Sequence, residues 1–202
     1  PGIAENAAFD GWSEQALDLA ADAAGIDRAV AHLAFSGGPV AMIGAWIDGI
    51  DAAMVRALPV ETLAGLSIRE RIRRLVQFRL DAVAGREEAV RRALAILAMP
   101  RNAAVALRRG WRSADLMWRL AGDTASDYNH YTKRTILAGV YAATLAAFID
   151  DESADKAETA QFLDRRIAGI IRFEKAKSRL VPPPGKHFSL TRFLGRLRYP
   201  AR

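Results

Sequence analysis

The sequence contains no cysteine, so it has neither a disulfide framework nor a thiolate metal site. Its histidines are few and scattered: His32, His130 and His187 fall in three different predicted elements, without the spacing of a metal site. A phosphate loop, a dinucleotide fingerprint and a Gly-x-Ser-x-Gly motif are also missing. We therefore expect a fold held by packing, with no metal, no cofactor, no catalytic residue and no enzymatic activity.

Charge of one sign is nearly missing from each end of the chain. Residues 1–55 contain eight acids and a single base, Arg28, whereas residues 165–202 contain eleven Lys or Arg and a single acid, Glu174. Charges are screened beyond roughly 10 Å at ordinary salt, so this local imbalance matters more than the net charge of +6. The C-terminal end is expected to bind anions.

The pattern of apolar residues predicts an all-α protein. Apolar residues recur every three or four positions, Gly and Pro separate these stretches, and no sustained alternation typical of strands is present. We divide the chain into a helix-turn-helix at 1–38, a helical ligand-binding bundle at 39–181, and a proline linker with a basic helix at 182–202. The expected helices span residues 13–24, 27–35, 39–58, 67–84, 87–98, 100–120, 127–149 and 156–180.

The first two of these helices form a helix-turn-helix with unusual charge. The string AADAAGIDRAVAHLAF at residues 20–35 resembles the DNA-binding segment of TetR-type repressors. A DNA reader needs cations for the phosphates, and here Arg28 stands alone among acids. We therefore interpret the unit as a degenerate scaffold that binds no nucleic acid. The alternative is a TetR-like transcriptional regulator that senses a lipid.

A proline-rich linker at 182–185 precedes a short amphipathic and basic stretch at 188–199. An apolar stripe flanked by arginines suits the surface of an anionic bilayer, although an inert soluble tail or a partner-binding helix remains an alternative. No apolar run reaches the roughly 18 to 20 residues that cross a bilayer, and we expect no signal peptide, because no basic start is followed by a short apolar block. We expect a cytoplasmic protein, peripheral on the inner membrane of a bacterium. The predicted membrane-binding residues are Phe188, Leu190, Arg192, Phe193, Leu194, Arg196, Leu197 and Arg198.

Residues 121–134, AGDTASDYNHYTKR, are dense in polar and aromatic side chains. Helix capping explains the first half of this string. It does not explain Tyr128 and Tyr131, which lie one helical turn apart and are typical of a protein-contact patch. The predicted partner-binding residues are Asp127, Tyr128, His130, Tyr131 and Arg134.

Together, FDGWS at 9–13, the TetR-like unit, the string at 121–134 and FLDRR at 162–166 resemble the ubiquinone-biosynthesis protein family of the ninth Coq type, the Coq9-like proteins. The resemblance implies a TetR-like fold that dimerises, and an accessory role without enzymatic activity. It further implies that an isoprenoid or quinone lipid is bound in a helical pocket and presented to an enzyme such as demethoxyubiquinone hydroxylase, with the C-terminal helix on the membrane. Mitochondrial members of the family have Trp where this chain has His130.

The expected long helix at 127–149 is the best candidate for one wall of the lipid pocket. Its small residues permit close packing or leave room for a ligand; they are Ala138, Gly139, Ala142, Ala143, Ala146 and Ala147. The predicted lipid-binding residues are Leu75, Trp118, Ile136, Val140, Tyr141, Leu145 and Phe148.

Overall fold

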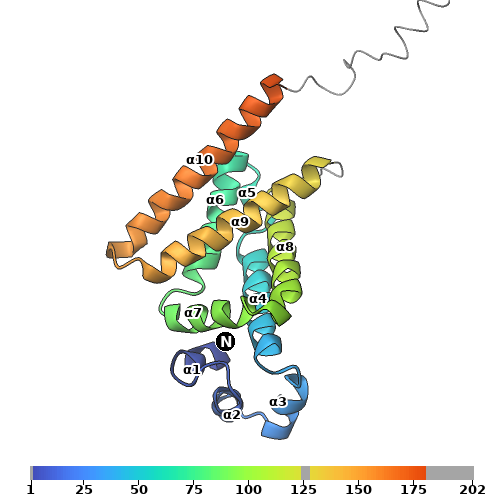
Figure 1. Ribbon diagram of the computed structural model, residues 1–202, viewed down its shortest axis with the longest axis vertical. Helices are drawn as coiled ribbons and strands as arrows, with labels where there is room; N and C mark the ends of the chain where they lie inside the picture. Colours follow the sequence, from blue (N-terminus) through green and yellow to red (C-terminus); the bar gives the residue numbers. More distant parts are fainter. Residues whose placement is uncertain (1, 124–127, 181–202) are drawn as a thin grey trace, which may run out of the picture.

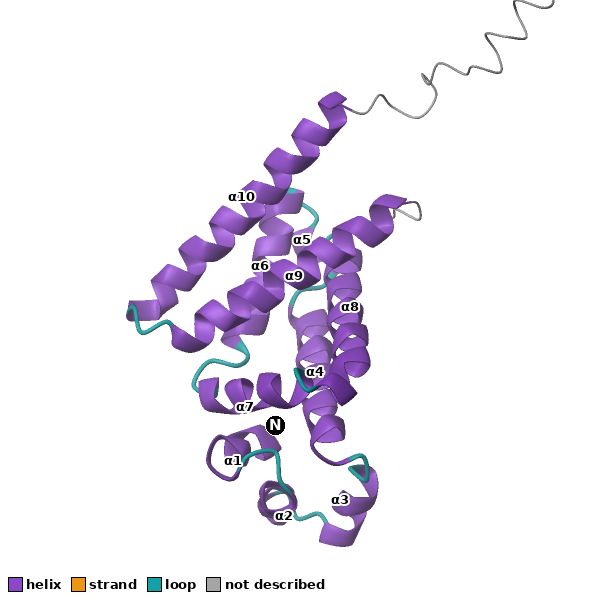
Figure 2. Cartoon of the chain, viewed as in Figure 1, coloured by secondary structure: helices purple, strands orange, loops and turns teal. Residues whose placement is uncertain are grey.

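The computed structural model describes residues 2–123 and 128–180, and all secondary structure within these ranges is helical (Figures 1 and 2). Two single-turn 3₁₀ helices, η1 (Pro100–Asn102) and η2 (Ala154–Lys156), precede longer helices. The α-helices are α1 (Gly2–Asp10), α2 (Glu14–Ala23), α3 (Arg28–Ala34), α4 (Gly38–Ala57), α5 (Val60–Leu63), α6 (Ile68–Asp81), α7 (Glu87–Leu97), α8 (Ala103–Leu120), α9 (Tyr128–Asp150) and α10 (Ala157–Leu180).

The ends of the helices follow from local chemistry in the sequence. Ser13, Asp27 and Ser67 accept hydrogen bonds from backbone N–H groups in the first turns of α2, α3 and α6, so their side chains cap these helices. Gly25 follows α2 with a φ of 66°, a left-handed conformation that glycine adopts without strain. All eight expected helices are present, and the expected starts and ends lie within a few residues of those observed.

Two helices were not expected from the sequence. In α1 the buried side chains are only those of Ala4 and Ala7, so its amphipathic pattern is too weak to stand out. Tertiary contacts stabilise α1, because it packs on α2 and on α7. Just after it, the Trp12 indole donates a hydrogen bond to the carbonyl of Ala89 at the start of α7, 3.0 Å away. The other unexpected helix, α5, is a single turn after Pro59.

The apolar side chains gather into two clusters that α4 joins. Ile50 and Met54 of α4 belong to a large cluster with α6, α8, α9 and α10, whereas Met42 and Ile43 belong to a smaller cluster with α1, α2 and α7. Trp46 packs against both clusters and lies 5.3 Å from the ring of Trp12. The N-terminal helices α1, α2 and α3 are thus joined to the bundle through α7 and through the N-terminal half of α4; Figure 1 shows them at one end of the molecule.

By length and composition alone, α4 is also apolar enough to cross a membrane. The sequence analysis expected no such segment, but the test is weak because the core helix of a globular bundle also passes it. The contacts of α4 with both clusters account for its apolar character as packing.

The single base among the first 55 residues is engaged by acids of its own unit. The Arg28 guanidinium forms ion pairs with Asp22 at 2.5 Å and with Asp18 at 3.4 Å, and the imidazole of His32 lies 2.7 Å from the other oxygen of Asp18. A phosphate approaching α3 would compete with these carboxylates for Arg28. The acids that surround Arg28 in the sequence therefore also pair with it in the structure.

The acidic residues 150–152 at the end of α9 are not all exposed to solvent. Asp150 is exposed, but Asp151 is only 6% exposed and accepts hydrogen bonds from the hydroxyl and backbone N–H groups of both Ser153 and Thr159. The Ser153 hydroxyl, followed by the Thr159 hydroxyl, holds the pKa of Asp151 well below its ordinary value of 3.8. Asp151 thus fixes the turn that brings α10 back along α9.

We predict that Asp151→Asn lowers the urea midpoint of unfolding at pH 7. The folded-state pKa is depressed, so the stability from this carboxylate is complete above pH 3.8 and is lost as the pH falls below that value. The difference between variant and wild type should accordingly shrink below pH 3.8 in a pH series of urea titrations. Asp150→Asn, a change at an exposed ion pair with Arg91, is the control and should shift the midpoint little. Equal midpoints for Asp151→Asn and wild type would contradict the assignment.

Candidate functional site

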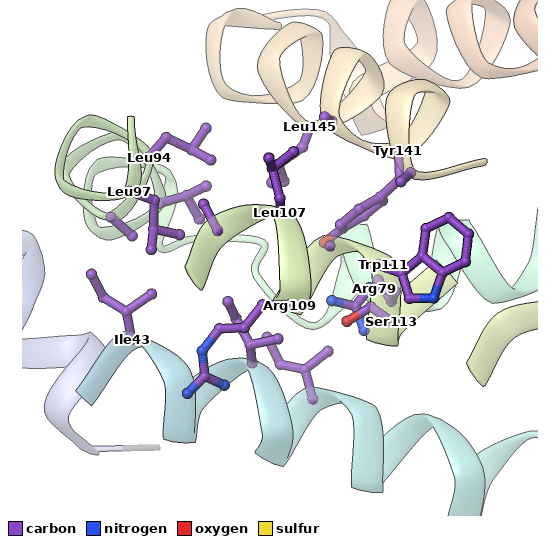
Figure 3. A pocket seen from close by; sticks show the side chains of 18 of the residues that line it. Ile43, Arg79, Leu94, Leu97, Leu107, Arg109, Trp111, Ser113, Tyr141 and Leu145 are labelled. Carbon is purple, nitrogen blue, oxygen red and sulfur yellow. The ribbon is translucent and has the colours of Figure 1, made fainter. Parts of the chain in front are cut away.

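A large cavity opens in the bundle between α4, α7, α8 and α9, with a volume of about 760 Å³ (Figure 3). Its lining is almost entirely apolar. Isoleucine and tryptophan side chains come from α4, leucines from α7, and Leu107 and Trp111 from α8. Leu107 is 76% exposed, which places an apolar side chain at the boundary between cavity and solvent. A pocket of this size and character suits a lipid chain or a drug-sized apolar molecule.

Small residues of α9 form one wall of the cavity. Ala138, Gly139 and Ala142 all line it, and a Cβ placed on Gly139 would meet no atom within 4 Å. Three of the six small residues that the sequence singled out as permitting close packing or leaving room for a ligand therefore border the cavity, whereas Ala143, Ala146 and Ala147 do not line it. The space beside this wall results from the small side chains and not from a break in the backbone, because α9 continues as a regular helix.

Two of the seven predicted lipid-binding residues, Tyr141 and Leu145, line the cavity. The others lie beside it in the packed core: Leu75, Val140 and Phe148 are buried in the large cluster, and Trp118 and Ile136 pack against that cluster. The sequence analysis chose the most apolar face of α9, which is the face that packs against the rest of the bundle. The cavity borders the neighbouring face of the helix, where the residues are smaller. Successive residues are rotated by about 100° around the helix axis, so residues next to each other in the sequence can lie on different faces.

A buried polar group interrupts the apolar lining. Arg79 of α6 forms an ion pair with Asp51 of α4, and Asp51 also accepts a hydrogen bond from the Ser113 hydroxyl of α8 at 2.8 Å. The Arg79 guanidinium lies 4.7 Å from the ring centroid of Tyr141, a cation–π contact. Arg79, Ser113 and Tyr141 all line the cavity (Figure 3).

The sequence analysis missed this group, although a signal was present. Arg79 follows Ile72, Leu75 and Val76 at helical spacing, and Asp51 stands beside Ile50 on the buried face of α4. A charged residue on an otherwise apolar face is rarely buried without a charged partner. Two such residues of opposite sign, on the apolar faces of different helices, indicate a buried ion pair.

A second arginine, Arg109 of α8, lines the cavity nearer its α4 wall. Its Nη1 donates to the carbonyl of Gly44 at 3.1 Å and lies 3.3 Å from a carboxylate oxygen of Asp48. A Cβ at Gly44 would overlap the Arg109 guanidinium, so a larger residue at this position would displace that head group. In Figure 3 the Arg109 head group points toward α4.

The predicted partner-binding surface lies at the start of α9, against α8. Tyr131 is 62% exposed, and its ring lies 5.9 Å from that of Trp111 and 5.2 Å from that of His130. Because Trp111 also lines the cavity, this group of aromatic rings adjoins the cavity lining. We call Trp111, His130 and Tyr131 the aromatic surface. Asp127 lies outside the described residues, as does the side chain of Tyr128.

Arg134 does not lie on this surface but beneath it. Its side chain is 2% exposed and forms ion pairs with Asp115 at 2.5 Å and with Asp123 at 3.0 Å, so it fixes α9 to α8 rather than facing a partner. Burial raises the pKa of Asp123, but hydrogen bonds from Lys133 and Arg134 outweigh it and keep this pKa below its ordinary value. The sequence placed Arg134 in the contact patch because charge was taken as a mark of exposure.

All eight predicted membrane-binding residues, from Phe188 to Arg198, lie outside the described residues. The assignment of residues 188–199 as a membrane helix stays a prediction, as do the boundaries of the three segments and the dimer.

Sequence comparison relates the chain to one family. The COQ9 family model matches residues 103–174, which include α8, α9 and most of α10. The ubiquinone biosynthesis protein COQ9, mitochondrial, of Rattus norvegicus is 34% identical over 165 residues, covering 78% of this chain and 52% of that protein. The Homo sapiens protein of the same name is 32% identical over 165 residues, covering 78% and 51%. The chain spans about half the length of the curated relatives it matches.

Structural comparison relates the fold to that of a transcriptional regulator. The crystal structure of the TetR transcriptional regulator from Nitrosomonas europaea superposes with a TM-score of 0.67 at 22% sequence identity, covering 85% of this chain and 97% of that one. At this identity the likeness concerns the fold. It confirms the prediction of an all-α, TetR-like bundle made from the sequence.

Proposed function

Because the chain belongs to the COQ9 family of ubiquinone biosynthesis proteins, we propose that it serves ubiquinone biosynthesis as a non-enzymatic accessory protein that binds an isoprenoid or quinone lipid. The observation on which this rests is the apolar cavity of about 760 Å³ between α4, α7, α8 and α9. Burial of a lipid chain there removes apolar surface from water, worth about 0.8 kcal/mol for each CH₂ group.

The position of the aromatic surface supports a second part of the proposal. Tyr131 is an exposed aromatic residue next to Trp111, and Trp111 lines the cavity. Amphipathic rings at such a place are typical anchors of protein interfaces. We propose that this surface receives a biosynthetic enzyme such as demethoxyubiquinone hydroxylase, so that the lipid is presented beside the docked enzyme.

The third part of the proposal concerns the membrane and rests on sequence alone. Residues 188–199 combine an apolar stripe with arginines, the composition of a helix that lies on an anionic bilayer. Contact with the membrane would bring the cavity to the compartment in which isoprenoid lipids dissolve.

Lipid binding is tested by filling the cavity. Gly139→Phe places a ring where a Cβ meets open space, so we expect about tenfold weaker binding of a short-chain ubiquinone, equivalent to the exclusion of about two CH₂ groups. Quenching of the Trp46 and Trp111 fluorescence measures the affinity, because both rings line the cavity.

The matched control for the cavity is Gly169→Phe in α10, where a Cβ also meets no atom but the residue does not line the cavity. This variant should bind the ubiquinone as the wild type does. Mass spectrometry of the purified wild type should in addition detect a quinone, an isoprenoid or a phospholipid. Repeated absence of all three, together with no quenching, would contradict the proposal.

Docking of the enzyme is tested at the aromatic surface. We expect Tyr131→Ala to weaken binding to the organism's own demethoxyubiquinone hydroxylase by at least about tenfold in titration calorimetry, because tyrosine is enriched among the few interface residues whose truncation costs about 2 kcal/mol or more. Phe9→Ala is the control, since Phe9 is 84% exposed but lies on α1. The surface would be wrongly assigned if the two variants bound alike.

Membrane contact is tested by flotation with anionic vesicles. The full chain should float, and the chain without residues 186–202 should not, because each basic group near such a surface contributes about 1 kcal/mol. Neutral vesicles should float the full chain less. Equal flotation of the two proteins would refute the membrane part of the proposal.

A further inference from the structure

The polar groups around Arg79 stand together on one part of the cavity wall, where α4, α6, α8 and α9 meet. The Arg79 side chain is 3% exposed, its Nη1 is bonded to Asp51, and Tyr141 covers one face of the guanidinium. Figure 3 shows the Tyr141 ring extending from α9 toward the Arg79 and Ser113 side chains. Stacking occupies the face of a guanidinium and leaves its N–H edge open.

Arg79 has donors that the protein itself does not use. Its Nε is buried and has no hydrogen-bond partner, and within the described residues its hydrogen bonding is limited to the Asp51 carboxylate. Within the described residues the Tyr141 hydroxyl also makes no hydrogen bond, although it is not fully buried like the Arg79 Nε. A buried N–H without an acceptor is unfavourable, and such groups are usually satisfied by a ligand or by water. Both donors belong to side chains that line the cavity.

The charge at this place is already balanced. The Asp51 carboxylate neutralises the guanidinium, and the Ser113 hydroxyl satisfies the second carboxylate oxygen. An anionic head group bound here would leave a net negative charge in an apolar environment, which is strongly unfavourable. A neutral acceptor would take the hydrogen bonds without changing the charge.

We infer that the cavity selects its lipid through a neutral carbonyl oxygen, which accepts hydrogen bonds from Arg79 and from the Tyr141 hydroxyl while the apolar chain lies along the α7 and α9 walls. This inference rests on the proposed lipid-binding function and adds to it a recognition site and a preference for uncharged head groups. Asp51 and Ser113 are positioning residues, because they hold the guanidinium in place.

Four probes in two matched pairs test the inference on the full chain. Decylubiquinone and decylbenzene share an alkyl chain and a ring, but only the first has carbonyl oxygens. Methyl palmitate and palmitate share a chain, but only the second is charged. Decylubiquinone is followed by quenching of the cavity tryptophans, and the other three by competition against it and by the melting temperature.

The wild type should bind decylubiquinone about tenfold more tightly than decylbenzene, and methyl palmitate more tightly than palmitate. Arg79→Met/Asp51→Asn removes both charges together and so avoids an orphaned ion, and it should reduce decylubiquinone affinity about tenfold with decylbenzene unchanged. Tyr141→Phe keeps the stacked ring and should lower decylubiquinone affinity by a smaller factor. The matched control is Arg73→Met/Asp164→Asn, which removes an ion pair of the same residue types between α6 and α10.

The outcomes separate this inference from the proposed function. If decylubiquinone and decylbenzene both leave fluorescence and melting temperature unchanged, the lipid-binding function itself fails. If both bind equally well and neither the Arg79 double variant nor Tyr141→Phe changes the affinity for decylubiquinone, the lipid function stands and the carbonyl site is overturned. Tighter binding of palmitate than of methyl palmitate would overturn the preference for a neutral head group.

Discussion

The position of the cavity depends on a difference in packing between two faces of α9. One face presents Leu137, Val140 and Phe148 to the large cluster and fixes the helix between α8 and α10. The adjacent face presents Ala138, Gly139 and Ala142, which are too small to fill the distance to α7. The helix is held firmly on one side, so the space on the other side cannot close by a shift of α9. The cavity exists because packing is complete on one face and incomplete on its neighbour.

Much of the fold was available from the sequence because it depends on local signals. Helical periodicity, capping by Ser13, Asp27 and Ser67, and the glycine after α2 each act within a few residues. What the sequence did not reveal depends on contacts between distant segments. The buried state of Asp151 requires Thr159, and α1 requires its contact with α7.

In the candidate site, too, properties of single residues were predictable from the sequence, whereas contacts between distant segments were not. The small residues of α9 and the exposed Tyr131 were visible in the sequence, because size and aromatic character belong to single residues. Which face of a helix borders the cavity depends on how the helix packs, and single residues do not reveal it. Five predicted pocket residues therefore lie in the core. Arg79 and Asp51 are neighbours across two helices, and Arg134 is buried by acids from α8 and from the residues after it. The apolar spacing around Arg79 and Asp51 marks each as a candidate for burial, but only the fold shows that the two charges pair with each other.

Trp111 belongs to two surfaces at once, since its indole lines the cavity and stacks near Tyr131 outside it. Interior and exterior therefore share a side chain. Any substitution that reshapes this part of the cavity also alters the aromatic surface, and any change that adapts the surface to a different partner alters the volume inside. Under the proposed function, the choice of ligand and the choice of partner would therefore not be independent traits, because one indole ring belongs to both sites.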